Sequence, residues 1–358
     1  MKIAMMTRWN VPSGQSAHAE PVGRAWLEMG YDLKVLAPRG MELTLLYQGD
    51  EPYVRRCYML DVWEARQLDD YFFDSRPFLE EDYEIFLVED VEIMPMPELL
   101  EIFPHIKKKA KTILIVHEVG LPPDPNWYRF DWDAIVCFDE RYKQFMAKAF
   151  PEEKIVIIPF PCHPPLYGDR MEARRLLKLP LEKKIVFSYG FGIANTHVDL
   201  FPVMDRLLKA SPVLLLLITH HEIVQLVTKP EFLLLKNEVP ATEKLYSYLH
   251  ASDAYVYYVR QGERKTMGVG VSSSVAACLG AGQPILVPGW CNFFDLSGKE
   301  VIKYRDLHDL ELKLRDVFED TDEIRRSLAA AKEYVARNSA HEIAARFIDL
   351  FRELNECM

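Results

Sequence analysis

The sequence contains no pair of cysteines at the spacing of a metal or redox motif. Its six cysteines are scattered along the chain, and none forms a Cys-x-x-Cys pair. This pattern excludes a disulfide framework and a cysteine-ligated zinc site, and it is typical of reduced, mostly buried thiols in a cytoplasmic protein. The six are Cys57, Cys137, Cys162, Cys278, Cys291 and Cys357.

Positive charge and long apolar runs are also scarce. The net charge is −11 at pH 7 with no basic stripe to offset it, which excludes a nucleic-acid-binding protein. No apolar run approaches the length of a membrane span, and the apolar start of the chain is too short for a signal peptide. The basic run His105–Lys111 is interpreted as a solvated helix end, with peripheral membrane contact as the alternative.

The dinucleotide fingerprint G-x-G-x-x-G is absent from the first turn of the chain. A strand at Lys2–Thr7 is followed instead by the loop Arg8–Gln15 and a helix that Ser16 caps and that runs to about Met29. A second strand follows at Asp32–Ala37. Such a strand–loop–helix–strand unit predicts an open parallel sheet, which binds ligands at the carboxyl edge of its strands.

The rest of the chain alternates strands and helices, and its 358 residues are enough for two domains. The proline-rich stretch Pro159–Gly168 is the best candidate boundary between them. Further strands are predicted at Tyr53–Leu60, Tyr83–Val88, Thr112–Val116, Ala134–Phe138, Ile155–Phe160, Ile185–Phe191, Val213–Thr219, Phe232–Lys236, Ala254–Val259, Ile285–Val287 and Val301–Tyr304. Further helices are predicted at Pro97–Phe103, Glu140–Phe150, Met171–Leu177, Leu200–Lys209, Glu243–His250, Ser272–Leu279 and in three segments from Leu310 onward.

The stretch Ser252–Gly289 combines a buried strand, a polar glycine-bearing loop and a helix that begins with serines. Glycines let a backbone approach a ligand closely, and a helix N-terminus with free N–H groups binds phosphate. Basic side chains just upstream add positive charge. An N-capped helix beside a solvated loop is the alternative interpretation. The candidate phosphate-binding residues are Arg260, Arg264, Lys265, Gly268, Gly270, Ser272, Ser273 and Ser274.

A histidine follows the fully apolar strand Thr112–Val116. His117 and Glu118 stand at the carboxyl end of this strand, where a side chain reaches the ligand crevice of a parallel sheet. A histidine in that place acts in acid–base chemistry or hydrogen-bonds a substrate. A purely structural histidine is the alternative.

Five stretches, in this order along the chain, resemble the GT-B glycosyltransferases of the retaining family-4 type. They are the opening MKIAMMTRWNVPSGQSAHAEPVGRAWLEMGYDLKVLAP, then TILIVHE, WDAIVCFDERYKQFMAKAFPEEKIVIIPFP, ASDAYVYYVRQG and LGAGQPILVPG. The resemblance implies two Rossmann-like domains with parallel sheets. Residues 1–164 form the acceptor-side domain, 165–340 the nucleotide-sugar-binding domain, and 341–358 a helix that packs back on the first domain.

The same resemblance implies a hexosyltransferase-like enzyme that moves a sugar from a nucleotide-sugar donor, of the UDP or GDP type, with retention. The acceptor class stays open between a sugar, a lipid-linked and a protein acceptor, and neither a metal nor another cofactor is expected. By position, Gly14, Gln15 and Ser16 match the family's loop beside the donor diphosphate. His117 matches the histidine that contacts the donor sugar, and we assign it as the catalytic residue. Ser272 to Ser274 match the helix mouth that receives the phosphates.

The sequence departs from this family at the donor site. The family's two glutamates, eight residues apart, are replaced by Val269 and Ala277, which puts recognition of the ribose in doubt. Its Arg and Lys after the first strand of the second domain are replaced by Phe191 and by Thr196 or His197. A buried diphosphate needs cationic partners. Arg260, Arg264, Lys265 and His197 are the candidate replacements.

Two other functions remain open. Loss of both glutamates and both cations also fits a non-catalytic GT-B protein that serves as a binding or partner subunit. Another GT-B enzyme, such as a nucleotide-sugar epimerase or a phosphorylase, is the third hypothesis. The acidic, aromatic stretch Tyr53–Phe78 is a candidate acceptor region, with a surface insertion as the alternative.

Overall fold

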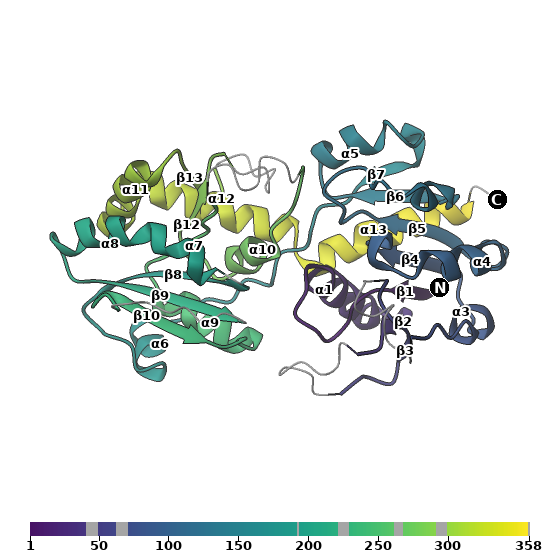
Figure 1. The fold of residues 1–358 in the computed structure, drawn as a ribbon, viewed down its shortest axis with the longest axis horizontal. Coiled ribbons are helices and arrows are strands. Elements are labelled where there is room, and N and C mark those ends of the chain that lie inside the picture. Colours follow the sequence, from purple (N-terminus) through teal and green to yellow (C-terminus); the bar gives the residue numbers. More distant parts are fainter. Residues whose placement is uncertain are drawn as a thin grey trace. The chain divides into compact units, whose positions relative to one another are not determined.

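The computed structural model describes residues 1–40, 49–61, 71–191, 193–220, 229–260, 268–290 and 299–356. The chain divides into two compact α/β units, which Figure 1 shows with their elements labelled. Unit 1 comprises Met1–Pro161, Met267–Val271 and Ala340–Met358, and unit 2 comprises Cys162–Thr266 and Ser272–Ser339. The predicted fold class, two α/β domains built on parallel sheets, is therefore confirmed.

Unit 1 is built on a seven-stranded parallel sheet with the strand order β3-β2-β1-β4-β5-β6-β7. The chain leaves β1 toward one edge and returns to β4 on its other side, so the strand order reverses between β1 and β4. The strands are β1 (Lys2–Met6), β2 (Asp32–Pro38), β3 (Val54–Tyr58), β4 (Ile85–Glu89), β5 (Lys111–Ile115), β6 (Ala134–Cys137) and β7 (Ile155–Ile157). The helices are α1 (Gly14–Glu28), α3 (Arg76–Glu80), α4 (Met96–Lys107), α5 (Glu140–Met146) and α13 (Ala340–Glu356).

The last helix, α13, completes unit 1, as the sequence predicted. Its buried residues recur at helical spacing and pack against α1. Trp26 of α1 lies at the centre of this contact: its indole N–H donates to the Ala344 carbonyl at 3.1 Å, and its ring meets Phe347 edge to face at 5.6 Å. Phe351 packs on the same indole.

Unit 2 is built on a six-stranded parallel sheet with the order β10-β9-β8-β11-β12-β13, which reverses between β8 and β11. The strands are β8 (Lys184–Phe191), β9 (Val213–His220), β10 (Leu233–Asn237), β11 (Ala254–Val256), β12 (Ile285–Pro288) and β13 (Ile302–Tyr304). The helices are α6 (Arg170–Leu176), α7 (Ala194–His197), α8 (Phe201–Leu208), α9 (Thr242–Ala251), α10 (Ser273–Leu279), α11 (Leu307–Glu319) and α12 (Asp322–Arg337). Neighbouring β8 residues serve opposite faces: Ile185 and Phe187 join one core, and Val186 the other.

Asp253, just before β11, fixes the amino edge of the second sheet. Its buried carboxylate accepts hydrogen bonds from the Ile185 backbone N–H at 2.7 Å and from the guanidinium groups of Arg174 and Arg170, each at 2.8 Å. Arg174 is itself buried and also donates to the Ala251 carbonyl. The carboxylate therefore joins α6 and the end of α9 to the start of β8.

The structure corrects one predicted helix start. Helix α1 begins at Gly14, and its N-cap is Ser13, whose Oγ accepts the N–H of Ser16 at 3.1 Å. Ser16 thus lies inside the first turn and does not cap the helix. Cys57, Cys137, Cys162 and Cys278 are buried free thiols, as expected, whereas Cys291 and Cys357 lie outside the described residues. In the described part of the chain, no helix is long and apolar enough to cross a membrane.

Candidate active site

The carboxyl edge of the unit 1 sheet gathers ionisable side chains where the strand order reverses. Glu89 ends β4 and Asp90 follows it, His117 and Glu118 follow β5, and α1 begins after the loop that follows β1. Strands β1, β4 and β5 are neighbours and parallel, so these ends meet at one edge. The sequence placed only His117 and the start of α1 in this group as site residues. Glu89 was hidden because it closes the strongly apolar run IFLVE.

Glu89 holds two histidines. One carboxylate oxygen is 2.7 Å from Nδ1 of His18, and the other is 2.6 Å from Nε2 of His117. His18 and Glu89 are fully buried, and the His117 side chain is 9% exposed. Burial alone would raise the pKa of Glu89, but the charges and hydrogen bonds of the two imidazoles outweigh it and lower this pKa to about 2. Because the carboxylate is ionised, both imidazoles donate to it.

The carboxylate fixes the state of His117. Its acceptor role keeps a proton on Nε2 and sets the orientation of the ring. Burial acts to lower the pKa of His117, but the hydrogen bond and charge of Glu89, with help from Asp90, raise it above its ordinary value. Nδ1 is the second nitrogen, and none of the described residues hydrogen-bonds to it. His117 is therefore equipped to hold a hydrogen-bonded substrate group through Nδ1.

Asp90 adopts a left-handed backbone conformation, with φ 60° and ψ 73°, which is uncommon for a residue other than glycine. Its largely buried carboxylate accepts a hydrogen bond from the side-chain amide of Gln15. Burial raises the pKa of Asp90, against the opposing effects of His117, Gln15 and Arg8. Local strain of this kind is found at functional sites, and here it stands where the strand order reverses.

Glu118 presents a carboxyl group that is protonated at neutral pH. Its Oε1 accepts the indole N–H of Trp127 at 2.8 Å, while the buried Oε2 has no hydrogen-bond partner. Burial, followed by the nearby charge of Asp90, raises the pKa of Glu118 to about 8. A neutral carboxyl group next to His117 can donate a hydrogen bond that a carboxylate cannot.

The three predicted residues at the start of α1 differ in their surroundings. Gly14 is exposed, with open space where a side chain would stand. Gln15 is buried and bound to Asp90, which joins it to the cluster around Glu89. Ser16 is buried, and its backbone N–H donates a hydrogen bond to the Ser13 hydroxyl oxygen.

Of the candidate cations of unit 2, the structure describes His197 and Arg260. The buried His197 imidazole bonds the Ser188 hydroxyl at 2.8 Å, and burial lowers its pKa to about 4, so it is neutral at pH 7. Arg260 is engaged by Asp199, with Nε 2.7 Å from the carboxylate, and it also donates to the Asn195 carbonyl. Arg264 and Lys265 lie outside the described residues.

The predicted phosphate-binding stretch is divided between the two units. Gly268 belongs to unit 1, with φ +70°, and a side chain there would meet the Val119 carbonyl oxygen at 1.8 Å. The Val269 N–H donates to the same carbonyl at 2.8 Å, and Arg141 donates to the Gly270 carbonyl at 3.2 Å. Gly268 therefore accommodates the protein's own backbone at Val119, close in sequence to His117 and Glu118.

The three serines belong to unit 2. Ser272 is the N-cap of α10, and its Oγ accepts the Val275 N–H at 3.4 Å. Ser274 lies near the phenols of Tyr189 and Tyr255, whose pKa values burial raises well above the ordinary value. Ala277, which replaces the second family glutamate, is buried in α10 and offers no polar group.

One described cluster has the composition of a metal site: His18, Glu89 and His117, whose ligand atoms all lie within 4.8 Å of one another. The contacts of 2.6 and 2.7 Å between the imidazole nitrogens and the carboxylate are direct hydrogen bonds. An ion between these atoms would require them to move apart, since zinc–nitrogen bonds alone are about 2.0 Å long. The arrangement fits a hydrogen-bonded triad.

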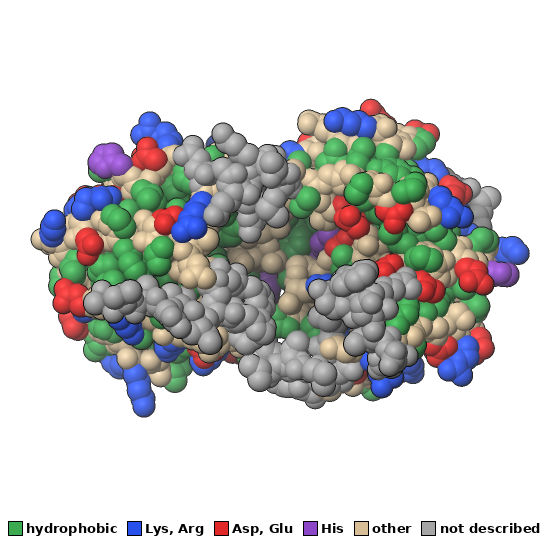
Figure 2. All heavy atoms as spheres, viewed as in Figure 1, with side chains coloured by type: hydrophobic (Ala, Val, Ile, Leu, Met, Phe, Trp, Pro, Cys, Tyr) green, Lys and Arg blue, Asp and Glu red, His purple; other side chains and the backbone are tan. Residues whose placement is uncertain are grey.

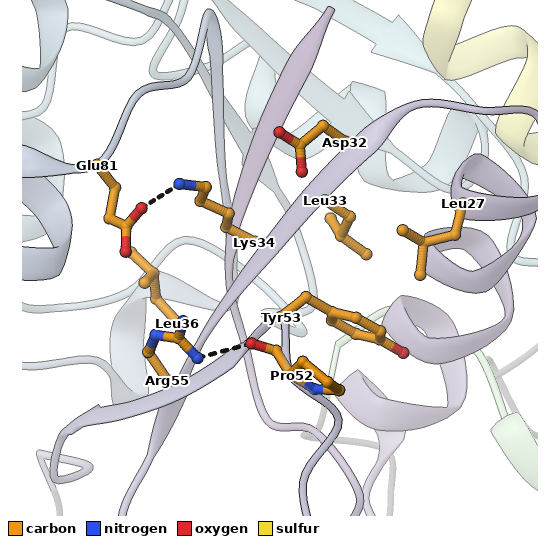
Figure 3. A pocket seen from close by; sticks show the side chains of 9 residues that line it. All are labelled: Leu27, Asp32, Leu33, Lys34, Leu36, Pro52, Tyr53, Arg55 and Glu81. Carbon is orange, nitrogen blue, oxygen red and sulfur yellow. Dashed lines mark hydrogen bonds and ion pairs between the residues drawn. The ribbon is translucent and has the colours of Figure 1, made fainter.

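A surface cavity of about 390 Å³ lies away from this edge, beside the first halves of β2 and β3 (Figure 3). Three of its four charged side chains are engaged within the protein, and the fourth, Asp32, is exposed. Lys34 bonds Glu81, and Arg55 donates to the Pro52 carbonyl at 2.7 Å, as the dashed lines show. We therefore assign no ligand to this cavity.

The basic run at the end of α4 is also engaged by unit 1. Lys107 pairs with Asp131 at 2.8 Å, and Lys109 donates to the Glu81 carbonyl and lies 4.0 Å above the Tyr83 ring. Positive and negative side chains are interspersed over the face drawn in Figure 2. These contacts favour the solvated helix end over a membrane-binding patch.

Solved structures similar to this chain cover its whole length. No protein-family model matches the sequence. Sucrose-phosphate synthase from Thermosynechococcus elongatus is 13% identical with a TM-score of 0.66, and the match covers 100% of both chains. The catalytic domain of starch synthase IV from Arabidopsis thaliana, bound to ADP and acarbose, is 10% identical with a TM-score of 0.68, over 99% of both chains.

A third structure carries a sugar nucleotide. This E. coli protein, described as trehalose-6-phosphate bound with UDP-2-fluoro glucose, is 10% identical with a TM-score of 0.63, over 98% of this chain and 99% of that chain. At such identities the likeness concerns the fold alone. Together with the two parallel sheets and their strand orders, it shows that this chain has the GT-B fold.

Proposed function

We propose that this protein is a glycosyltransferase that takes a sugar from a nucleotide-sugar donor. The observation that carries the proposal is the match of both units, over the whole chain, to GT-B structures that include one bound to ADP and one bound to UDP-2-fluoro glucose. We propose a donor of the UDP or GDP type. The acceptor is left open between a sugar, a lipid-linked molecule and a protein.

We propose that His117 contacts the sugar during transfer and that Glu89 holds it in place. The acceptor hydroxyl oxygen bonds to C1 of the sugar and gives its proton to the departing diphosphate oxygen, while the nucleoside diphosphate leaves with the electrons of the broken C1–O bond. In such a reaction the protein positions the reactants and stabilises the charge of the leaving group. Glu89 orients the His117 ring through Nε2, and none of the described residues hydrogen-bonds to Nδ1. This arrangement supports the positioning role.

We further propose transfer with retention and without a metal, on the family resemblance. Gly14, Gln15 and the serines of α10 are the proposed phosphate-side residues. Support comes from the exposed start of α1 and from the partly exposed Ser273 and Ser274. Acceptor binding by the unit 1 domain and donor binding by the unit 2 domain complete the proposal.

The first test is a thermal-shift and calorimetric titration with UDP, GDP, ADP and their sugars. A ligand that binds the folded state raises the melting temperature by mass action. We expect one nucleotide class to do so and its sugar to be hydrolysed or transferred, with release of the free nucleoside diphosphate as the readout. No shift with any nucleotide would favour the non-catalytic binding subunit.

Two substitutions test the site. His117→Ala and Ser273→Ala should each reduce turnover strongly, while the exposed His105→Ala and the half-buried Ser247→Ala serve as matched controls. Near-wild-type turnover in both site variants would reject the site assignment. The fold and the nucleotide titration would be unaffected by that result.

A further inference from the structure

The second histidine bound to Glu89, His18 of α1, is fully buried and has no surface that a substrate could touch. Its Nδ1 donates to one oxygen of the Glu89 carboxylate at 2.7 Å, and Nε2 of His117 donates to the other oxygen at 2.6 Å. In the described part of the chain, the Glu89 carboxylate has no other hydrogen-bond partner. Each imidazole therefore serves one carboxylate oxygen, and of the two rings only His117 is partly exposed.

Packing holds the His18 ring as firmly as its hydrogen bond does. Three phenylalanine rings of unit 1 surround it, with ring centroids 5.2, 5.4 and 6.0 Å from the imidazole centroid. They are Phe138 after β6, Phe160 after β7 and Phe347 of α13. Because protein interiors are close-packed, a ring enclosed from several elements keeps one orientation. Nδ1 of His18 therefore stays directed at Glu89.

The other nitrogen of His18 has no hydrogen bond. Nε2 is buried, and none of the described residues is bonded to it. A buried polar atom without a partner costs free energy. A phenylalanine in this place would pack among the same three rings without that cost. The bond from Nδ1 to Glu89 is thus what an imidazole contributes here and a phenylalanine ring would not.

Without His18, one oxygen of a fully buried carboxylate would have no donor. Burial acts to raise the pKa of Glu89, and His18 supplies the largest of the opposing effects. A Glu89 that lost this partner would take the proton that His117 carries on Nε2. His117 would then keep a proton on Nδ1 alone and would lose its positive charge, since a neutral imidazole has one N–H.

We propose that His18 is a positioning residue that keeps Glu89 ionised, so that the proton between Glu89 and His117 stays on Nε2. Nδ1 is then the one nitrogen of His117 that gains and loses a proton, and it is also the nitrogen to which no described residue bonds. Asp90 and Glu118 are the other ionisable groups that act on His117, and they bond to Gln15 and Trp127 instead.

This inference deepens the proposed function without depending on it in full. His18 acts through Glu89 and does not itself contact a substrate. Its effect on sugar transfer rests on the proposed function, because it passes through His117. The place of the proton can be measured in the protein alone.

The test separates ring packing from hydrogen bonding at one position. His18→Phe keeps an aromatic ring but removes the N–H, whereas His18→Asn removes the ring but keeps an amide N–H as many bonds from the backbone as Nδ1. His18→Leu also lacks the N–H and takes the place of His18→Phe if the larger ring prevents folding. His105→Phe is the control, because His105 is exposed at the end of α4. Circular dichroism shows which variants fold.

The first readout is nuclear magnetic resonance of protein with isotope-labelled histidine, recorded without substrate on the acid side of the raised pKa of His117. Protonated and unprotonated ring nitrogens have well-separated shifts, and His117→Asn identifies the His117 signals by their loss. We expect both His117 nitrogens to be protonated in the wild type, in His105→Phe and in His18→Asn. In His18→Phe, the Nε2 signal should move toward the shift of an unprotonated nitrogen.

The second readout is nucleoside diphosphate release. A partner that orients a ligand-binding histidine is worth about 10- to 100-fold in activity, and we expect a loss of this size in His18→Phe. His18→Asn should lose less turnover, although it should melt at a lower temperature because it leaves a gap among the phenylalanine rings. A histidine that served packing alone would give the opposite order of turnover.

Two results would overturn the inference. They are an Nε2 signal in His18→Phe that matches the wild type, and a turnover of His18→Phe that equals or exceeds that of His18→Asn. An unchanged signal in an active enzyme would reject the inference and leave the proposed function intact. A shifted signal in a protein that releases no nucleoside diphosphate from any nucleotide sugar would support the assigned place of the proton and reject the proposed function.

Discussion

The two sheets have the same reversal of strand order but different chemistry at their carboxyl edges. In unit 1 that edge holds an ionised Glu89 between two imidazoles, with Asp90 and Glu118 nearby. In unit 2 the described part of the edge holds the neutral His197, bonded to Ser188, and the partly exposed ion pair of Arg260 with Asp199. One topology thus supports a buried carboxylate–imidazole cluster in unit 1 and a neutral imidazole beside a partly exposed ion pair in unit 2.

The buried carboxylates sharpen this contrast. Glu89 is at the carboxyl edge of its sheet and faces two groups that can exchange protons. Asp253 is at the amino edge of its sheet and faces arginines and a backbone N–H. These groups do not exchange protons near neutral pH. Ligands of open parallel sheets bind at the carboxyl edge, so the first carboxylate is placed for function and the second for stability.

The largest expected effect follows from Glu89→Gln. A glutamine accepts through its oxygen but donates through its nitrogen, so one of the two imidazoles must change its tautomer. We expect a loss of turnover of about 100-fold, as for other groups that orient a ligand-binding histidine. The measurement is nucleoside diphosphate release, with circular dichroism to show that the variant folds. The exposed Glu92→Gln is the control, and equal turnover in the two variants would remove Glu89 from the site.

Asp253→Asn should show the opposite behaviour. The change leaves the buried Arg174 without a charged partner, which costs about 3–5 kcal/mol of unfolding free energy. Turnover per folded molecule should stay near the wild-type value at temperatures below unfolding. Urea unfolding measures the stability, with the exposed Asp205→Asn as the control. A folded variant that has lost turnover would contradict the contrast between the two carboxylates.

Glu118→Gln tests the pH sensitivity of the unit 1 edge. Because the folded-state pKa of Glu118 is raised to about 8 from 4.5, its contribution to stability is present at low pH and is lost as pH rises toward 8. Glutamine mimics the protonated acid and keeps the bond from Trp127. In the wild type, we expect the unfolding free energy to fall by about 1 kcal/mol per pH unit over this range. In the variant, we expect this fall to be absent. An unchanged slope would mean that Glu118 is ionised in the native state.

The two histidines should give smaller effects of opposite sign. The folded-state pKa of His117 is raised above 6.5, so its contribution is present at low pH and is lost as pH rises through the raised value. The pKa of His197 is lowered to about 4, so its contribution is present above 6.5 and is lost as pH falls toward 4. His117→Asn should therefore flatten the alkaline side of the stability profile, and His197→Asn the acid side. Urea unfolding at a series of pH values compares them.

Much of the fold followed from local patterns in the sequence. Runs such as IFLVE and TILI mark fully buried parallel strands, and the spacing of Ile343, Phe347 and Phe351 marks an amphipathic helix. Boundaries were less certain: α5 ends at Met146, short of the predicted Phe150, and β11 ends at Val256, short of Val259. The helix or strand propensity of a residue does not indicate where the neighbouring elements that the segment packs against come to an end.

The candidate site was only partly visible in the sequence. His117 could be found because it directly follows an apolar strand. Glu89 bonds His117 across 28 positions and His18 across 71 positions, and hydrogen bonds over such separations leave no local signal.

The packing of α13 on α1 sets the order in which the protein is completed during synthesis. Trp26 is made early but reaches its partners Ala344, Phe347 and Phe351 only after more than three hundred further residues have been joined. Until then α13 does not cover Trp26 of α1, while every segment assigned to unit 2 has already been made. Chaperones that bind exposed apolar surface would therefore bind α1 until synthesis ends, although α1 belongs to the part of the chain that is made first.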